Sequence, residues 1–187
     1  MKELIDGYLK TLTLKLDDFD CGSLVTIIEV LQNARMKGKN IFVIGNGGSA
    51  ATASHFACDF GKNAVKSDEG RFRVISLCES TSSITAYGND ISFDSVFEEQ
   101  LKNLMGREDV VIAISASGNS PNIVKAVNYA KSKAGVIIGL TGFNGGRLKE
   151  LSDININSDF NTYEQIEDFH LILTHIIVYC FKAINMK

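Results

Sequence analysis

Short, uninterrupted apolar runs recur along the sequence, and three of them lead directly into loops rich in glycine or serine. The runs lie at 41–44, 72–77, 110–114 and 136–140, with a weaker candidate at 154–156. A run that is apolar at every position predicts a strand buried on both faces. Segments of helical length and spacing separate these runs, at 49–60, 82–104 (in two pieces) and 121–133. This alternation predicts βαβ units and a parallel sheet with helices on both faces.

Helical patterns also occupy both ends of the chain. Residues 3–17 and 23–36 carry apolar residues at helical spacing, and 163–184 has the pattern of one long apolar helix. With 187 residues, the chain is long enough to bury one large core. We therefore expect an α/β fold with a doubly wound, mostly parallel five-stranded sheet, arranged as a helical N-terminal extension (1–37) and an α/β core (38–187). In such a sheet, ligands bind beyond the carboxyl ends of the strands.

Composition excludes several classes of function. The net charge is −3 and no block of Lys or Arg stands out, so neither nucleic acid nor an anionic membrane is an expected partner. No apolar run approaches the roughly 18 residues of a membrane-spanning helix, and the N-terminal residues lack the apolar stretch of a signal peptide. The four cysteines share no C-x-x-C spacing. We expect a cytoplasmic protein whose cysteines are reduced and mostly buried.

The first loop, Gly-Asn-Gly-Gly-Ser-Ala at 45–50, follows the first apolar run. Glycines permit close backbone approach, and the next helix would direct its unpaired N–H groups toward a bound anion. A tight turn with nothing bound is an alternative. The dinucleotide pattern G-x-G-x-x-A also fits, but the acidic residue expected about 20 positions later is missing, since Glu79 lies nearly 30 residues away.

The second loop, Ser-Ala-Ser-Gly-Asn-Ser-Pro at 115–121, follows the third run. Ser120 and Pro121 suit the N-cap and first position of a helix, so capping alone would explain Ser120. Capping does not explain three serines on one short loop, which favour a phosphate monoester. The chain has no G-x-x-x-x-G-K-[ST] motif, which disfavours a nucleoside triphosphate. The third loop, 141–146, is typical of a turn into a short helix.

The three histidines are His55, His170 and His175. A lone helical histidine is often structural, and His55 with Asp59 at i+4 can be an ordinary surface pair. Their position directly after a phosphate loop favours proton transfer or metal binding instead. His170 and His175 lie on the last helix with acidic residues nearby. A sugar phosphate beside such groups indicates aldose–ketose isomerisation through an enediol.

Six motifs stand in the order found in phosphoheptose isomerases, a family of SIS (sugar isomerase) domains. They are Gly-Asn-Gly-Gly-Ser (45–49), His-Phe-Ala-x-Asp (55–59), Gly-Asn-Asp (88–90), Ser-x-Ser-Gly-Asn-Ser-x-Asn (115–122), Thr-Gly-x-x-Gly-Gly (141–146) and Glu-Asp-x-His-x4-His (167–175). The chain resembles this family over nearly its whole length. The resemblance implies a single SIS domain over 1–187 that converts sedoheptulose 7-phosphate to D-glycero-D-manno-heptose 7-phosphate.

The resemblance also implies roles for individual residues. The substrate-binding set is Asn46, Gly47, Gly48, Ser49, Asp59, Asn89, Asp90, Ser115, Ala116, Ser117, Ser120 and Glu167. Within it, the serines and the Ala116 backbone would hold the phosphate, while Asn89 and Asp90 would hold sugar hydroxyls. The zinc ligands, for one Zn²⁺ per subunit, would be His55, Asp59, Glu167 and His175. Asp59 and His175 also match the proposed base and acid. The family is typically a homotetramer with active sites between subunits.

Three positions depart from the family pattern. Asp59 stands where a Glu is expected, Glu167 where a Gln is expected, and Ala116 where a Thr is expected. The carboxylate at 59 is shorter, and an added carboxylate at 167 would favour a divalent cation. These changes leave the substrate and the assignment of the base open.

Helix geometry gives a separate prediction for the metal ligands. Glu167 and His175 are eight residues apart, roughly 12 Å along a helix axis. One straight helix cannot place both on a single zinc, so two subunits would have to contribute, or the helix would have to break. The apolar stripe of this helix suits either helix–helix burial between subunits or ordinary core. Its members are Ile166, Phe169, Leu173, Ile176 and Ile177.

Two other functions remain open. A non-catalytic SIS module could bind a sugar phosphate or a partner protein. A different enzyme on the same fold, such as an isomerase of another ketose phosphate or a lyase acting on an amino-sugar phosphate, would use similar loops. The sequence settles neither the sugar length nor the metal, nor whether the product enters lipopolysaccharide, capsule or nucleotide-activated heptose synthesis.

Overall fold

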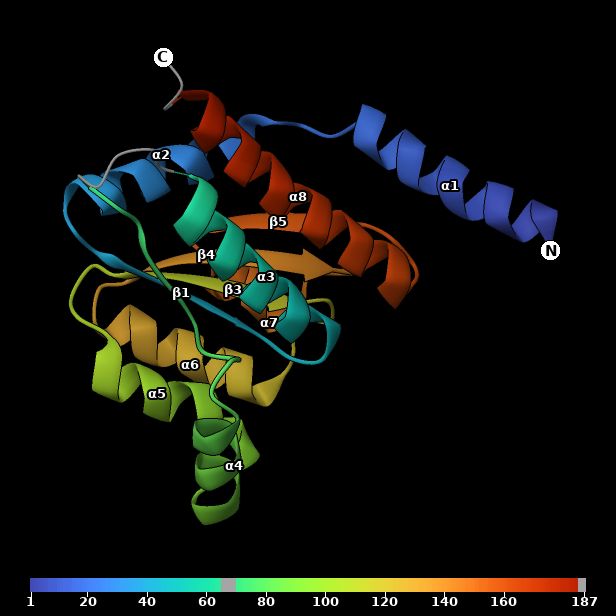
Figure 1. Cartoon of the computed structure of the whole chain (residues 1–187). Helices are drawn as coiled ribbons and strands as arrows, with labels where there is room; N and C mark the ends of the chain where they lie inside the picture. Colours follow the sequence, from blue (N-terminus) through green and yellow to red (C-terminus); the bar gives the residue numbers. More distant parts are fainter. Residues whose placement is uncertain (65–69, 185–187) are drawn as a thin grey trace.

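The computed structural model describes residues 1–64 and 70–184 (Figure 1). The elements, in chain order, are α1 (Lys2–Asp17), α2 (Gly22–Met36), β1 (Asn40–Gly45), α3 (Gly48–Asn63), β2 (Arg73–Ser76), α4 (Thr81–Asp90), the 3-10 helix η1 (Phe93–Ser95), α5 (Val96–Leu104), β3 (Val110–Ser115), α6 (Pro121–Ser132), β4 (Val136–Gly142), α7 (Gly146–Leu151), β5 (Ile154–Ser158) and α8 (Tyr163–Ile184). Each strand and helix expected from the apolar patterns is present, and 82–104 is divided as predicted.

The five strands form one sheet with the order β2-β1-β3-β4-β5, and every neighbouring pair is parallel. The chain passes from β1 to β2 on one side, then returns to place β3 on the other side of β1. This reversal makes the carboxyl ends of β1 and β3 the switch point of the sheet, where doubly wound folds bind ligands. The first and second loops begin at these two strand ends.

Alternate residues of each strand supply two hydrophobic layers. In β1, Ile41 and Val43 pack into the layer beneath α2, α3 and α8, while Phe42 and Ile44 pack into the layer beneath α5 and α6. This period of two explains why the strand must be apolar throughout. Figure 1 shows the corresponding helices on opposite faces of the sheet.

Helix α8 contributes most of its apolar stripe to this core. Ile166, Phe169, Leu173 and Ile177 are each at most 3% exposed, whereas Ile176 is only partly buried. Of the two readings of the stripe, the structure supports ordinary core. The Phe60 and Phe181 rings meet edge to face, with centroids 5.3 Å apart, and so join α3 to α8.

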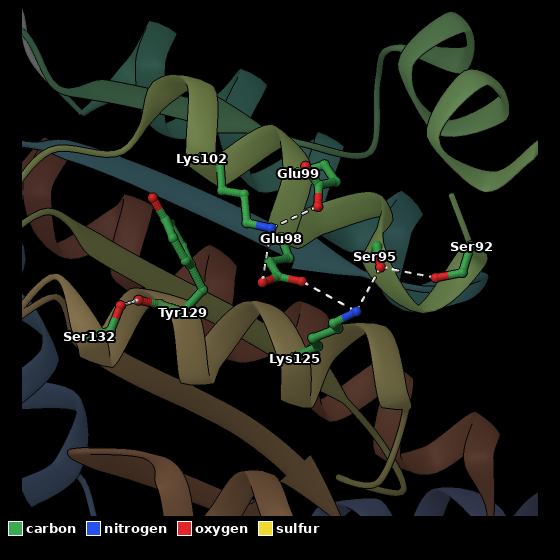
Figure 2. Close-up of polar contacts among 8 residues, drawn as sticks. All are labelled: Ser92, Ser95, Glu98, Glu99, Lys102, Lys125, Tyr129 and Ser132. Atoms are coloured by element: carbon green, nitrogen blue, oxygen red, sulfur yellow. Dashed lines mark hydrogen bonds and ion pairs between the residues drawn. The ribbon is translucent and has the colours of Figure 1, made fainter. Parts of the chain in front are cut away.

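A polar network ties η1, α5 and α6 together (Figure 2). The Lys125 ammonium donates to the Ser95 hydroxyl at 2.8 Å and lies 3.5 Å from the Glu98 carboxylate. Lys102 pairs with Glu98 at 3.2 Å and with Glu99 at 2.7 Å. Exposed ion pairs contribute little stability individually, but a shared network fixes geometry. It holds η1 in place just beyond the end of α4.

Helix α1 buries no residue and extends away from the sheet (Figure 1). Two hydrogen bonds fasten it to α8: the Tyr8 hydroxyl donates to Asp168 at 2.5 Å, and Gln165 Nε2 donates to the Tyr8 carbonyl at 3.1 Å. The Asp168 contact raises the pKa of Tyr8 to about 12. Several large apolar side chains of α1 remain exposed, namely Leu4, Ile5, Leu9, Leu14 and Leu16.

The cysteines are free thiols, but the expectation of burial was wrong for two of them. Cys21 and Cys58 are exposed, while Cys78 and Cys180 are half-buried. Cys58 occupies the outer face of α3, and Cys21 occupies the N-cap position of α2, so helical placement overrides the general preference of the thiol for the interior. No helix in residues 1–64 and 70–184 has the length and apolar character needed to cross a bilayer.

Candidate active site

Two strand-to-helix loops enclose a cavity at the switch point of the sheet. Its volume is about 180 Å³, and its lining consists of Asn46, Ser49, Ile114, Ser115, Ala116, Ser117, Ser120, Tyr163 and Glu167. Seven of these nine residues belong to the predicted substrate-binding set. A larger cavity of about 460 Å³ lies between α1 with its connection to α2 and the end of β5 with its connection to α8, and it shares no lining residue with the smaller one. Functional groups converge on the smaller cavity, so it is the candidate site.

The first loop brings the backbone close to the start of α3. Gly47 adopts a φ of +55°, in the left-handed region that glycine tolerates best. A side chain at Gly45 would overlap the backbone of Ser49. The loop therefore folds tightly enough to place the first N–H groups of α3 at the cavity.

The serine loop leaves its hydroxyl groups free of helix capping. Ser120 occupies the N-cap position of α6 and Pro121 the first helical position, as expected, but the Ser120 side chain makes no capping hydrogen bond. Its hydroxyl instead lies 3.4 Å from that of Ser115. The capping explanation for Ser120 therefore does not account for its hydroxyl, and Ser120 lines the cavity together with Ser115 and Ser117.

The third loop supports the serine loop from behind. The Gly142 N–H donates to the Ala116 carbonyl, and the Leu148 N–H donates to the Gly118 carbonyl, both at 2.9 Å. Gly118 has a φ of +64°, and a Cβ there would overlap the Gly145 carbonyl. The third loop does turn into a short helix, α7, as the sequence indicated. Its role in the fold is to fix the position of the serines.

A second group of functional residues lies on the facing sides of α3 and α8. His55 Nε2 is 3.3 Å from Asp59 Oδ2, and His175 Nε2 is 3.9 Å from the same oxygen. The other oxygen, Oδ1, accepts a hydrogen bond from Asn63 at 3.4 Å. One donor atom from each of His55, Asp59 and His175 lies within 4.8 Å of the others, so these residues could hold a metal ion.

Glu167 does not join that group in the same chain. Helix α8 is continuous from Tyr163 to Ile184, which places Glu167 two turns before His175. The Glu167 carboxylate lies against Gly48, the first residue of α3, where a Cβ would overlap it. A carboxylate at a helix N-terminus is electrostatically favourable. The structure thus brings together three of the four predicted metal ligands and places the fourth at the serine-lined cavity.

Asn89 and Asp90 lie at the end of α4, outside the cavity of their own chain. Both are exposed, and Asn89 Nδ2 donates to Asp90 Oδ1 at 2.8 Å. Neither residue lines the cavity of the same chain, so their contact with sugar hydroxyls stays a prediction.

His170 is structural. It is fully buried, and its Nε2 lies 3.0 Å from the Thr141 carbonyl, to which it donates, and 3.1 Å from the Ser158 hydroxyl. Its Nδ1 has no hydrogen-bond partner within the described ranges 1–64 and 70–184. Burial lowers the pKa of His170 to about 4, so it is neutral near pH 7.

Sequence reasoning assigned no role to two residues at the site. Tyr163 forms one wall of the cavity, and its ring meets that of Phe143 edge to face with centroids 5.0 Å apart. Asn122 is buried behind Asn46. The motif at 115–122 contained Asn122, so its place in that motif was the available signal. Nothing in the local pattern indicated that Tyr163, at the start of a helix, would reach the cavity.

Comparison with known proteins agrees with this arrangement. The sequence profile of the SIS domain matches residues 8–142. The phosphoheptose isomerase of Aliarcobacter butzleri is 39% identical over 150 residues, which cover 80% of this chain and 77% of the relative. That of Helicobacter hepaticus is 38% identical over 149 residues, covering 80% and 76%. The solved structure of phosphoheptose isomerase GmhA from Neisseria gonorrhoeae superposes with a TM-score of 0.88 at 29% identity, covering 97% of this chain and 98% of that one. The chain belongs to the phosphoheptose isomerase family of SIS-domain proteins.

Proposed function

We propose that the protein is an aldose–ketose isomerase that converts sedoheptulose 7-phosphate to D-glycero-D-manno-heptose 7-phosphate through an enediol. The main support is that helices α3 and α8 each contribute residues to both the serine-lined cavity and the His–Asp–His cluster. The cavity suits a small anionic group, and the cluster suits proton transfer. Both are needed to hold a phosphorylated sugar and to move a hydrogen along its carbon chain.

The phosphate would bind at the serine loop. Ser115, Ser117 and Ser120 offer hydroxyl groups, and the N-termini of α3 and α6 add backbone N–H groups and positive dipole ends. The cavity of about 180 Å³ is small for a nucleotide. Gly47 and Gly48 would border the carbon chain, and the Glu167 carboxylate would accept hydrogen bonds from its hydroxyls.

Isomerisation requires a base and an acid. In the proposed reaction, Asp59 takes a proton from C1 of the ketose while His175 donates a proton to the C2 carbonyl oxygen, which gives the 1,2-enediol. Return of a proton to C2 and loss of the O1 proton complete the aldose, so atoms and charge balance. Asp59 Oδ2 and His175 Nε2 are 3.9 Å apart, so the two side chains are close enough to act on adjacent atoms of one substrate.

The cluster also has the composition of a zinc site, with one ion per subunit. Two imidazole nitrogens and one carboxylate oxygen are three protein ligands that leave a position open, as in catalytic zinc sites. His55, Asp59 and His175 would hold the ion through one atom each, which would leave the second carboxylate oxygen of Asp59 and the second ring nitrogen of His175 for proton transfer. A zinc ion bound there supplies Lewis-acid stabilisation to negative charge that develops on a substrate oxygen.

The proposed assembly is a homotetramer with sites shared between subunits, each subunit being a single SIS domain over 1–187. The exposed apolar face of α1 supports this assembly, because such faces usually pack against a partner. Asn89, Asp90 and Glu167 support shared sites, because none joins the His–Asp–His cluster of its own chain. Replacement of Leu9 by Glu should shift the assembly toward smaller species in light scattering.

The decisive experiment is incubation of the purified protein with sedoheptulose 7-phosphate, with and without a chelator, followed by NMR. The expected result is formation of the aldose phosphate, with one solvent deuterium per product when the reaction is run in D₂O. A panel of pentulose, hexulose and heptulose phosphates would define sugar length. Tight binding of these compounds without any turnover would contradict the proposal and favour a non-catalytic SIS module.

A further inference from the structure

Two asparagine side chains join the first loop to the serine loop. Asn46 Nδ2 donates to Asn122 Oδ1 at 2.9 Å, and Asn122 Nδ2 donates to Asn46 Oδ1 at 2.9 Å. The residues are 76 positions apart. Each carboxamide uses one N–H and one oxygen lone pair in this reciprocal pair. The pair fixes the two side chains relative to each other, since rotation of either amide would place oxygen against oxygen and N–H against N–H.

A third hydrogen bond fixes the orientation of the two carboxamide groups. Asn122 is the second residue of α6 and only 1% exposed. Its Oδ1 also accepts from the backbone N–H of Ile123 at 3.0 Å. A backbone N–H can only donate, so the oxygen of Asn122 must face the start of α6 and its nitrogen must face Asn46. The orientation of Asn46 follows from that of Asn122.

Asn46 lies at the boundary of two cavities, unlike the buried Asn122. It is half-buried and lines the serine-lined cavity as well as a neighbouring cavity of about 180 Å³ that Cys78 and Phe93 border. The reciprocal pair leaves one N–H and one lone pair of Asn46 unused. These are the groups that Asn46 can offer to a bound molecule.

We infer that Asn122 is a positioning residue that holds the Asn46 carboxamide with its remaining N–H available to the bound sugar phosphate. The inference rests on the proposed function, because it requires a substrate whose oxygens need a donor at this place. A carboxamide is nearly symmetric in shape, so a half-turn would present its oxygen instead. Negative charge that develops on a substrate oxygen is stabilised by an N–H and repelled by an oxygen. Asn122 thus keeps the N–H of the Asn46 carboxamide, and not its oxygen, directed toward the substrate.

The test compares Asn46→Ala, Asn122→Ala and the double variant, with sedoheptulose 7-phosphate as substrate. We expect Asn122→Ala to lower kcat/KM by about tenfold to a hundredfold, similar to Asn46→Ala, because misplacement by about 1 Å is costly. The double variant should match Asn46→Ala within about twofold, because Asn122 acts only through Asn46. Asn103→Ala is the matched control: Asn103 is exposed, donates to the Tyr87 hydroxyl at 2.8 Å and should leave kcat/KM unchanged.

Asn122→Asp provides a second test if Asn122→Ala does not fold. The carboxylate retains the acceptors for Ile123 and Asn46 but has no donor for Asn46 Oδ1, and it should lower kcat/KM as well. Unchanged activity in a folded Asn122 variant would overturn the inference. An additional loss of tenfold in the double variant over Asn46→Ala would also overturn it, because Asn122 would then act independently.

A readout that does not depend on turnover separates this inference from the proposed function. In the wild-type protein, the side-chain NH₂ signals of Asn46 should show slow rotation and reduced hydrogen exchange in ¹⁵N NMR spectra, and Asn122→Ala, which removes the acceptor for the Asn46 N–H, should abolish both. If the wild-type protein shows no turnover, but the Asn46 signals are present in it and lost in the variant, the proposed isomerase function is contradicted and the positioning role of Asn122 is not. Asn46 signals that do not respond to the Asn122 substitution would count against the positioning role alone.

Discussion

The Nε2 atoms of His55 and His175 lie 3.5 Å apart, although 120 positions separate the two residues in the chain. Their rings meet nearly edge to face, with an interplanar angle of 74°. Both side chains are about half exposed, and both lie near the same oxygen of Asp59. Helical spacing on α3 places His55 beside Asp59, and the packing of α3 against α8 brings His175 to the same oxygen.

Replacement of a cluster member should remove metal binding without unfolding the protein. We expect His175→Gln and Asp59→Asn each to weaken Zn²⁺ binding by at least about tenfold in calorimetry, because each removes one of three ligands. His175→Gln should also abolish turnover. The stability of these variants should change by no more than about 0.5 kcal/mol, since the side chains are not core residues. Glu29→Gln, which alters an exposed carboxylate on α2, should leave zinc affinity unchanged and serves as the control. Full zinc affinity in His175→Gln would exclude the cluster as the metal site.

Shared sites predict complementation between inactive subunits. We expect His175→Gln and Asp90→Ala to be inactive separately. When the two proteins are unfolded together and refolded as mixed oligomers, some sites would combine the intact His175 of one subunit with the intact Asp90 of another. Partial activity should therefore return, as measured by aldose phosphate formation. Two samples that are refolded separately and mixed afterward provide the control. No recovery in mixed oligomers of confirmed composition would mean that each site is built within one chain.

The Ser120 hydroxyl does not cap α6, and its replacement should change substrate binding with little change in stability. Ser120→Ala should raise KM by about tenfold to a hundredfold, because one hydrogen bond to a charged phosphate contributes roughly 1.5–3 kcal/mol. Its thermal stability should stay nearly constant, since the hydroxyl does not cap α6. Ser80→Ala is the matched comparison. The Ser80 hydroxyl accepts from the Ser83 N–H at 3.2 Å and caps α4, so its loss should cost about 1 kcal/mol of stability. An unchanged KM with a clear loss of thermal stability in Ser120→Ala would identify Ser120 as a structural residue.

Buried His170 predicts loss of stability in acid. In the folded protein its pKa lies near 4, below the ordinary value of 6.5. Between these values the unfolded chain binds a proton that the folded chain does not, so stability is full above about pH 6.5 and falls toward pH 4. The expected loss is about 3 kcal/mol, measured by urea unfolding at several pH values. In His170→Gln this part of the pH dependence should disappear, whereas variants of the exposed His55 should retain it. An unchanged pH profile in His170→Gln would show that His170 is not the group responsible.

The strands could be predicted because each run is apolar at consecutive positions, as at 41–44, and the structure places alternate residues of that run in opposite layers. The sequence also indicated where the candidate site would lie, since the glycine and serine loops follow β1 and β3 and both border the cavity. The side-chain relations within the site did not follow. Glu167 and His175 were known to be far apart along a helix, but which of them faces Asp59 depends on how α8 packs on α3.

Other contacts at the site depend on packing that no local pattern encodes. Ser120 has the position of a capping residue, yet its hydroxyl lies toward Ser115 rather than the helix. Asn122 could be seen in a motif, but its partner Asn46 is distant in the sequence. Tyr163 lines the cavity, and its ring packs against that of Phe143 from the third loop. Each of these depends on the tertiary arrangement of two loops.

Gly48 and Glu167 show how closely α3 and α8 constrain one another, since the missing side chain of the first makes room for the carboxylate of the second. The same pair of helices carries the His–Asp–His cluster. A change that slides one helix against the other would therefore disturb both the serine-lined cavity, where we propose that the phosphate binds, and the cluster to which we assign proton transfer.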